Sequence, residues 1–227
     1  MTGRPRRPSA VVFDCDGVLA DTEALHDRIM AEEVSRLGWE ITPEQGAKLF
    51  RGLAWEAIAP QVEQRLGPGS VPADFLPGLI VRVVRALEQE AQPVPFVLDA
   101  LAAIRGANIP VAVASNSSRA ELATKLRRLG LAPIFADRAF SVNDVERPKP
   151  FPDMYRAAAA ACDADPHFCV VVEDSVAGAR AGIAAGCRVL GYTGGSPGDA
   201  LAAVGAEPFA DMRELPGLLG LTRDHAA

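Results

Sequence analysis

Residues 10–23 read AVVFDCDGVLADTE. The first four of these residues are apolar, which predicts a short buried strand that ends just before Asp14. Asp14 and Asp16 follow at the end of this strand, and a turn at Gly17 lets both carboxylates face one crevice. Open α/β sheets bind their ligands at such strand ends. Two carboxylates in one crevice can perform complementary chemistry on a single phosphate group.

Further along the chain, short apolar runs alternate with helical patterns. The runs span residues 110–114, 139–142, 169–172 and 188–191, and the helical patterns include residues 118–129, 153–162 and 175–185. Strands that are apolar throughout are typical of a parallel sheet with helices on both faces. The sequence therefore predicts an α/β protein with a doubly wound, Rossmann-like core.

Residues 22–92 interrupt this alternation with helical patterns and no convincing strand. The patterns cover residues 23–37, 43–50, 55–66 and 74–90, and glycines separate them. We therefore expect a helical domain of residues 21–92, inserted into a core of residues 1–20 and 93–227. The two connections, near residues 20–22 and 92–95, are candidate hinges.

Composition narrows the classes of function. The net charge of −6 disfavours a nucleic-acid-binding surface, and no segment is long and apolar enough for a membrane span. The cysteines have no metal-type spacing and lie mostly in or beside apolar runs; they are Cys15, Cys162, Cys169 and Cys187. Buried free thiols are typical of a reducing compartment, so we expect a cytoplasmic protein, and we expect a monomer. For Cys15, a role as a small buried residue is favoured over a role as a redox switch.

Four segments carry a resemblance to a known family. Residues 14–22 resemble the first motif of the haloacid dehalogenase superfamily in its phosphotransferase form, and residues 112–116, 149–153 and 171–178 resemble its next three motifs in order. The resemblance covers about residues 9 to 215. It implies a helical cap at the insertion point and a Mg²⁺-dependent enzyme acting on a small phosphorylated metabolite.

The resemblance assigns complementary roles to the two aspartates. Asp14 would be the nucleophile that forms an aspartyl-phosphate. Asp16 would protonate the leaving oxygen and then activate the hydrolytic water, so it must start protonated. An apolar, closed site would raise the pKa of Asp16 sufficiently for that role. Without the other motifs, two such aspartates would be read as a turn or a helix cap.

Hard oxygen ligands of the kind that Mg²⁺ prefers lie at two strand ends. By resemblance, the metal site consists of Asp14, the backbone carbonyl of Asp16, and Asp174. Glu173 would either bind the metal directly or hydrogen-bond to the residues that do. The alternative for Glu173 and Asp174 is a pair of acids that cap the following helix.

Phosphate also needs hydrogen-bond donors and a cation. Ser115 ends an apolar strand and, with the start of the next helix, would cradle a phosphate, while Ser118 is explained by capping alone. Lys149 lies between two prolines and would neutralise the charge of the phosphate and the nucleophile. Asn116, within the second motif, is a predicted substrate-binding residue.

The predicted cap contributes the remaining candidates for substrate binding. Thr22, His26, Arg51 and Gly52 occupy places where related sugar-phosphate enzymes contact substrate or gate proton transfer. His26 faces either the cleft or solvent, and the sequence leaves these alternatives open. Gly52 allows the backbone near Arg51 to approach a ligand closely.

The first functional hypothesis is a phosphatase for a sugar phosphate or a similar ester. A phosphomutase of the beta-phosphoglucomutase type is the alternative, but Trp55 and Ser118 stand where that pattern has an arginine and a lysine. Dehalogenase chemistry is less favoured, because it assigns no function to Asp16. A non-catalytic sensor of phosphorylated ligands would need a broken motif, and all four motifs are intact.

Overall fold

The structure is a computed structural model, and it describes residues 7–51, 53 and 55–221. Within these residues the chain divides into two compact units. The first unit combines residues up to Asp21 with those from Gln92 onward, and the second spans Thr22–Ala91. Each unit has its own hydrophobic core.

The first unit contains a six-stranded, fully parallel sheet in the order β5-β4-β1-β6-β7-β8. The strands are β1 (Ala10–Phe13), β4 (Val111–Ala114), β5 (Ala139–Phe140), β6 (Cys169–Glu173), β7 (Arg188–Tyr192) and β8 (Glu207–Phe209). The strand order reverses at β1, which pairs with β4 on one side and β6 on the other. Such a reversal opens a crevice at the carboxyl ends of the strands.

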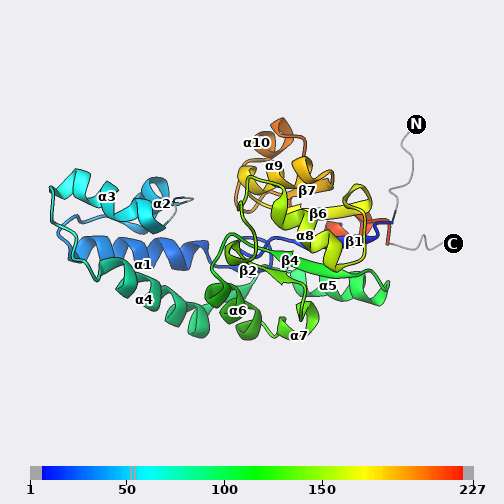
Figure 1. The fold of residues 1–227 in the computed structure, drawn as a ribbon, viewed down its shortest axis with the longest axis horizontal. Coiled ribbons are helices and arrows are strands. Elements are labelled where there is room, and N and C mark those ends of the chain that lie inside the picture. Colours follow the sequence, from blue (N-terminus) through cyan, green and yellow to red (C-terminus); the bar gives the residue numbers. More distant parts are fainter. Residues whose placement is uncertain (1–6, 52, 54, 222–227) are drawn as a thin grey trace. The chain divides into compact units, whose positions relative to one another are not determined.

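Both faces of this sheet are buried, as Figure 1 shows for the helices around it. One face packs against α5 (Val97–Gly106), α6 (Arg119–Arg128), α7 (Ala132–Phe135) and α11 (Leu215–Leu218). The other packs against α8 (Asp153–Ala161), α9 (Val176–Ala185) and α10 (Gly198–Ala203). Short 3₁₀ turns lie at Val142–Asp144, Pro166–Phe168 and Met212–Glu214. Alternate residues of β1 enter opposite cores, with Val11 in one and Val12 in the other.

The second unit consists of four helices, α1 (Glu23–Arg36), α2 (Pro43–Phe50), α3 (Trp55–Leu66) and α4 (Phe75–Glu90). Their apolar faces share one core that includes Ile29, Val34 and Leu79. A two-stranded antiparallel ribbon lies where the chain leaves and re-enters the first unit, with β2 (Ala20–Asp21) paired to β3 (Gln92–Pro93).

The predicted doubly wound α/β core is confirmed by the parallel sheet and its helices. Several elements were absent from the prediction, among them α5 and β8. Helix α5 is dominated by Val, Leu, Ile and Ala, so its composition does not separate it from a buried strand. Strand β8 has only three residues, two of them exposed and one a proline, so it lacks an apolar run.

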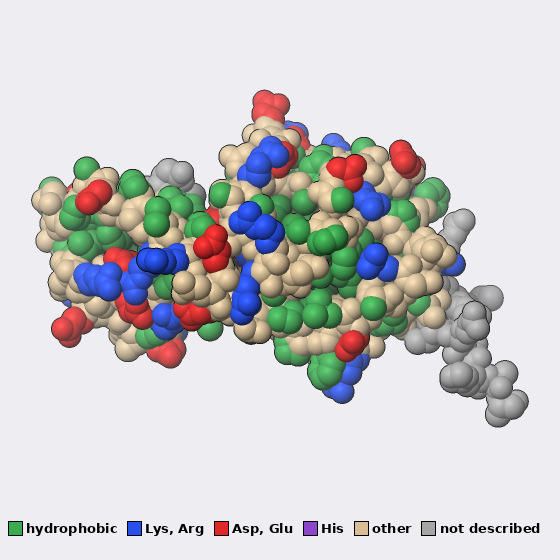
Figure 2. Space-filling view, turned by 90° about the horizontal axis from the view of Figure 1, so that it is seen from below, with side chains coloured by type: hydrophobic (Ala, Val, Ile, Leu, Met, Phe, Trp, Pro, Cys, Tyr) green, Lys and Arg blue, Asp and Glu red, His purple; other side chains and the backbone are tan. Residues whose placement is uncertain are grey.

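The surface carries charges of both signs. On the face in Figure 2, acidic and basic side chains lie interspersed. None of the helices in the described residues combines the length and the apolarity that a membrane span requires.

Candidate active site

Three neighbouring strands of the sheet deliver polar side chains to the same edge. Asp14 follows β1, Ser115 follows β4, and Glu173 ends β6. Their backbones continue the parallel ladder, because the Asp14 amide donates to the Val172 carbonyl at 2.9 Å and the Ser115 amide donates to the Phe140 carbonyl at 2.9 Å. The predicted strand-end site therefore rests on the hydrogen-bonded ladder of the central strands.

A tight loop returns the chain after β1. Gly17 has a φ of +73°, a conformation that suits glycine, and its amide donates to the Ala20 carbonyl at 2.8 Å. The amides of Leu19 and Ala20 both donate to the Cys15 carbonyl at 2.9 Å. The predicted turn at Gly17 is confirmed, and the loop fixes the backbone of Asp16.

Lys149 lies at the centre of the acidic groups. Its Nζ is 2.5 Å from Asp14 Oδ1 and 2.7 Å from Glu173 Oε1, and its side chain is only 3% exposed. Burial opposes the charged form, but the two carboxylates outweigh it and hold the pKa of Lys149 above its usual value. Lys149 is therefore a fixed positive charge beside Asp14.

Two residues hold Lys149 and its partner in place. The Asn116 side chain accepts from the Lys149 amide at 3.0 Å and donates to the Lys149 carbonyl at 3.2 Å. The hydroxyl of the buried Tyr155 donates to Glu173 Oε1 at 2.9 Å, and Lys149 Nζ lies 4.8 Å from the centre of its ring. Asn116 thus clamps the backbone of Lys149, and its assignment to substrate binding stays a prediction.

Asp14, Glu173 and Asp174 form a buried acidic cluster in which one carboxylate oxygen from each lies within 4.8 Å of the others. Glu173 Oε2 accepts from the amide of Ser175 at 2.8 Å and from its hydroxyl at 2.9 Å. Both oxygens of Glu173 therefore already accept protein donors. This arrangement suits Glu173 to orienting the cluster. Asp14 and Asp174 are then the carboxylates suited to binding a cation.

Two glycines confine Asp174. A Cβ atom on Gly17 or on Gly195 would lie 2.0 Å from Asp174 Oδ2, so any larger residue would displace the carboxylate. Gly195 belongs to the loop after β7, a strand that the motifs do not include. The chain thus reserves space on two sides of this carboxylate.

The electrostatics of the cluster favour an additional cation. Burial raises the pKa of Asp14, the charge of Lys149 opposes that rise, and the neighbouring charges of Glu173 and Asp16 add to it. Burial also acts against the charge of Glu173, but Lys149 outweighs it and holds the pKa of Glu173 below its usual value. Three hard carboxylates beside one ammonium group fit a small divalent cation such as Mg²⁺.

Asp16 has partners of its own. Lys125 Nζ lies 2.5 Å from Asp16 Oδ2, and the Ser117 hydroxyl donates to the same oxygen at 2.8 Å. Ser115 Oγ lies 3.3 Å from it. The expectation of apolar surroundings for Asp16 is therefore wrong, because α6 directs Lys125 inward. The capping of α6 by Ser118 is confirmed, with reciprocal bonds to Glu121.

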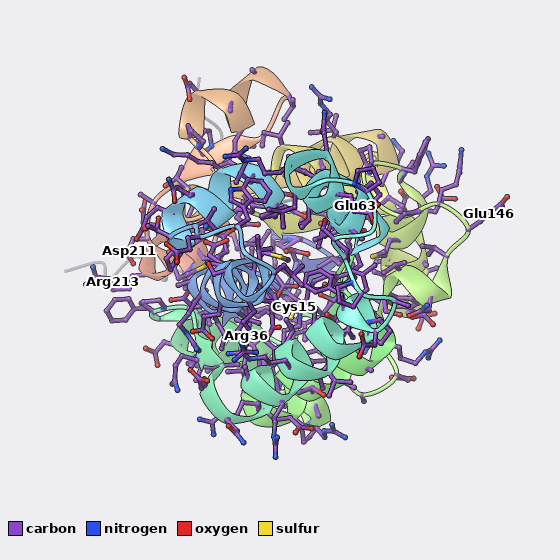
Figure 3. All side chains as sticks on the ribbon, turned by 90° about the vertical axis from the view of Figure 1, so that its left-hand side faces the viewer. Cys15, Arg36, Glu63, Glu146, Asp211 and Arg213 are labelled. Carbon is purple, nitrogen blue, oxygen red and sulfur yellow. The ribbon has the colours of Figure 1, made fainter. Side chains whose placement is uncertain are left out.

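Cys15, between the two aspartates, is inert packing. Its side chain is fully buried in the core, and Figure 3 labels it among the side chains of the interior. Burial raises the pKa of its thiol, which keeps it protonated. All four cysteines are free and buried, as predicted.

The remaining candidates belong to the helical unit. Thr22 is buried at the start of α1, and its carbonyl accepts from the His26 amide at 3.0 Å. Arg51 lies 2.7 Å from Glu23 Oε2 and also binds Asp27. Gly52 lies outside the described residues. Substrate binding by these four residues stays a prediction.

Sequence reasoning missed Lys125 and Tyr155. Each lies inside a predicted helix, where its type alone is compatible with a surface or a core position. One signal was present: lysine occurs only at positions 48, 125 and 149, and position 125 lies on the helix face of Leu122 and Leu126.

Comparisons with known proteins identify the family. Residues 8–186 match the model of the haloacid dehalogenase-like hydrolases. The chain is 29% identical over 212 residues to 6-phosphogluconate phosphatase of Escherichia coli K12, covering 93% of this chain and 95% of that protein. It is 31% identical over 188 residues to hexitol phosphatase B of the same strain, covering 82% and 84%.

A solved structure matches over nearly the whole length. The structure of a HAD family hydrolase from Deinococcus radiodurans R1, with bound phosphate and sodium, superimposes with a TM-score of 0.80 at 31% identity, covering 96% of this chain and 98% of that one. The chain belongs to the haloacid dehalogenase-like hydrolase family, and it is an enzyme of that family.

Proposed function

We propose that this enzyme is a Mg²⁺-dependent phosphatase that releases phosphate from a small phosphorylated metabolite through an aspartyl-phosphate on Asp14. The observation that carries the proposal is the pairing of the buried Asp14 with Lys149 at the end of β1, next to Asp174. A separate group of donors holds the second carboxylate, Asp16. This arrangement supplies a nucleophile, a cation and a proton-transfer group.

In the first step, the Asp14 carboxylate attacks phosphorus while the bond from phosphorus to the leaving oxygen breaks. Asp16 gives its proton to that oxygen, which leaves as an alcohol. Lys149 and the Ser115 hydroxyl stabilise negative charge on the phosphoryl group. In the second step, water attacks phosphorus while the bond from phosphorus to the Asp14 oxygen breaks, and the Asp16 carboxylate takes a proton from the water. Phosphate leaves, and the Asp14 carboxylate and protonated Asp16 are restored.

Mg²⁺ would be held by the Asp14 and Asp174 carboxylates and the Asp16 backbone carbonyl, with Glu173 orienting the group. When bound, Mg²⁺ offsets the charge of the phosphate and orients it for in-line attack. The donor set supports this proposal, because it consists of hard oxygens and carries more negative than positive charge.

Replacing Gly195 with alanine tests the metal site from outside the ligand set. The added Cβ would push Asp174 aside, so we expect the Mg²⁺ concentration for half-maximal activity to rise about tenfold or more. Gly78→Ala is the matched control, because a Cβ at Gly78 meets nothing within 4 Å. An unchanged Mg²⁺ requirement in Gly195→Ala would contradict the assignment of Asp174.

A sugar phosphate is the substrate class that we propose. The two phosphatases compared above are named for the phosphates of a sugar acid and of hexitols. We also propose that the helical unit acts as the cap that selects the substrate, with Thr22, His26, Arg51, Gly52 and Asn116 as candidates for binding it.

A phosphatase lets water attack the phosphoenzyme. A mutase excludes water until a second hydroxyl group of the sugar accepts the phosphoryl group. We expect steady Mg²⁺-dependent release of phosphate from sugar phosphates, with no stimulation by a sugar bisphosphate. The measurement follows phosphate and glucose 6-phosphate together during incubation with beta-glucose 1-phosphate, beside a panel of sugar and polyol phosphates. Full activity in EDTA would exclude the metal, and isomerisation that outruns phosphate release would favour the mutase.

A further inference from the structure

Asp16 Oδ2 is surrounded by donors. Lys125 Nζ, Ser117 Oγ and Ser115 Oγ lie 2.5, 2.8 and 3.3 Å from it. A carboxylate oxygen has two lone pairs, so these contacts fill its capacity to accept hydrogen bonds. A proton on Oδ2 would face an ammonium group. Proton transfer through this oxygen is therefore unfavourable.

Lys125 is an unusual residue for its position. Its side chain is completely buried, on a helix face that otherwise carries Leu122 and Leu126 into the core. Burying an ammonium group is costly unless a counter-charge is present. The Asp16 carboxyl group, 2.5 Å from Lys125 Nζ, is the acidic partner at this position.

Lys125 and Ser117 form one unit. Lys125 Nζ lies 2.6 Å from Ser117 Oγ, and both reach the same oxygen of Asp16. The Ser117 amide in turn donates to Ser115 Oγ at 3.1 Å. The cluster therefore joins helix α6 and the end of β4 to the loop after β1. None of the four sequence motifs includes Lys125.

Resting on the phosphatase function proposed above, we propose that Lys125, with Ser117, is a positioning residue for Asp16. The pair holds Oδ2 and thereby fixes the direction of the carboxyl group that gives and takes the proton. Lys125 is completely buried and contacts Asp16 Oδ2 and Ser117 Oγ, so its proposed role is exerted through Asp16.

The proposal predicts which bond is affected. In the first step, the proton moves from the Asp16 carboxyl group to the leaving oxygen as the phosphorus–oxygen bond breaks and the bond to Asp14 forms. A leaving group that is stable as an anion does not need this proton, whereas a poor leaving group does. Loss of Lys125 should therefore harm esters according to their leaving group.

Phenyl phosphate and p-nitrophenyl phosphate are matched in shape and differ in their need for the proton. For Lys125→Met we expect kcat/KM to fall about 100-fold with phenyl phosphate, the lower end of the usual effect of general acid catalysis, and only a few-fold with p-nitrophenyl phosphate. The ratio kcat/KM reports formation of the phosphoenzyme, so later hydrolysis does not enter. Lys48→Met, an exposed lysine of the helical unit, should change neither value.

The outcomes separate the two proposals. Failure of the wild-type enzyme to release phosphate from either ester would overturn the proposed function. An active wild type with equal losses for both esters in Lys125→Met, or with no loss, would overturn the positioning role alone. If Lys125→Met does not fold, Ser117→Ala should show the same selective loss, reduced in size, and Ser117→Thr should restore activity by keeping the hydroxyl. Equal losses for both esters in Ser117→Ala would also overturn the proposal.

Discussion

Asp14→Asn is expected to fold normally and to lose turnover by about 10⁴-fold or more, because an amide cannot form the covalent intermediate. Asparagine has nearly the shape of aspartate and can still accept a hydrogen bond from Lys149 Nζ, which lies 2.5 Å from Asp14 Oδ1. The loss should therefore come from chemistry and not from packing. Steady-state phosphate release, with thermal denaturation of both proteins, measures the two contributions.

The intermediate itself provides a second measurement. Acid quenching of the wild-type enzyme during turnover should trap phosphate on the protein, and hydroxylamine should release it, as for an acyl phosphate. Asp14→Asn should trap none. Substantial turnover in this variant, or trapped phosphate that hydroxylamine does not release, would contradict the assignment of Asp14 as the nucleophile.

Lys149→Met is expected to reduce turnover by about 10³-fold, the upper range for loss of one electrostatic group. Lys149 is the cation that contacts both Asp14 and Glu173, so its loss leaves two buried carboxylates without their shared counter-charge. Breaking a buried ion pair in this way costs about 3–5 kcal/mol of folding stability. Both activity and the free energy of unfolding should fall.

The two effects of this substitution can be separated. Tyr155→Phe removes only the hydroxyl that donates to Glu173 Oε1 and keeps the ring beside Lys149. It should lower stability by about 1 kcal/mol and activity far less than Lys149→Met does. Assays well below the melting temperature of Lys149→Met should still give the full loss. Recovery of near-normal turnover on cooling would assign Lys149 to stability alone.

Those parts of the fold that depend on local sequence pattern could be predicted from the sequence. The parallel core could be predicted because strands buried on both faces are apolar at every position, as in β1 and β6. Helices α2 and α3 have the predicted bounds, with Pro43 opening α2 and Gly67 following α3. The grouping of Asp14, Lys149 and Glu173 could be predicted because the resemblance joins segments that are distant in the chain.

The rest depended on side-chain direction. Lys125 and Tyr155 reach the site from helices, and one step along a helix turns a residue by about 100°. Sequence could not show which of them faced inward, so the environment of Asp16 was wrongly expected to be apolar. Asn116 illustrates the same limit, since its motif position gives no sign that both ends of its amide bind the backbone of Lys149.

The small β2–β3 ribbon has a consequence for how such an enzyme can diversify. It pins together the two points at which residues 22–91 depart from and rejoin the catalytic unit. The two ends of the inserted segment are therefore held together by the first unit itself. A longer insertion then adds little to the conformational entropy lost on folding. On the proposal that the helical unit selects the substrate, exchanging residues 22–91 should change selectivity and leave the chemistry of the first unit unchanged. A chimera that carries a relative's helical segment between Asp21 and Gln92 should keep its phosphoryl-transfer apparatus and acquire the donor's preference.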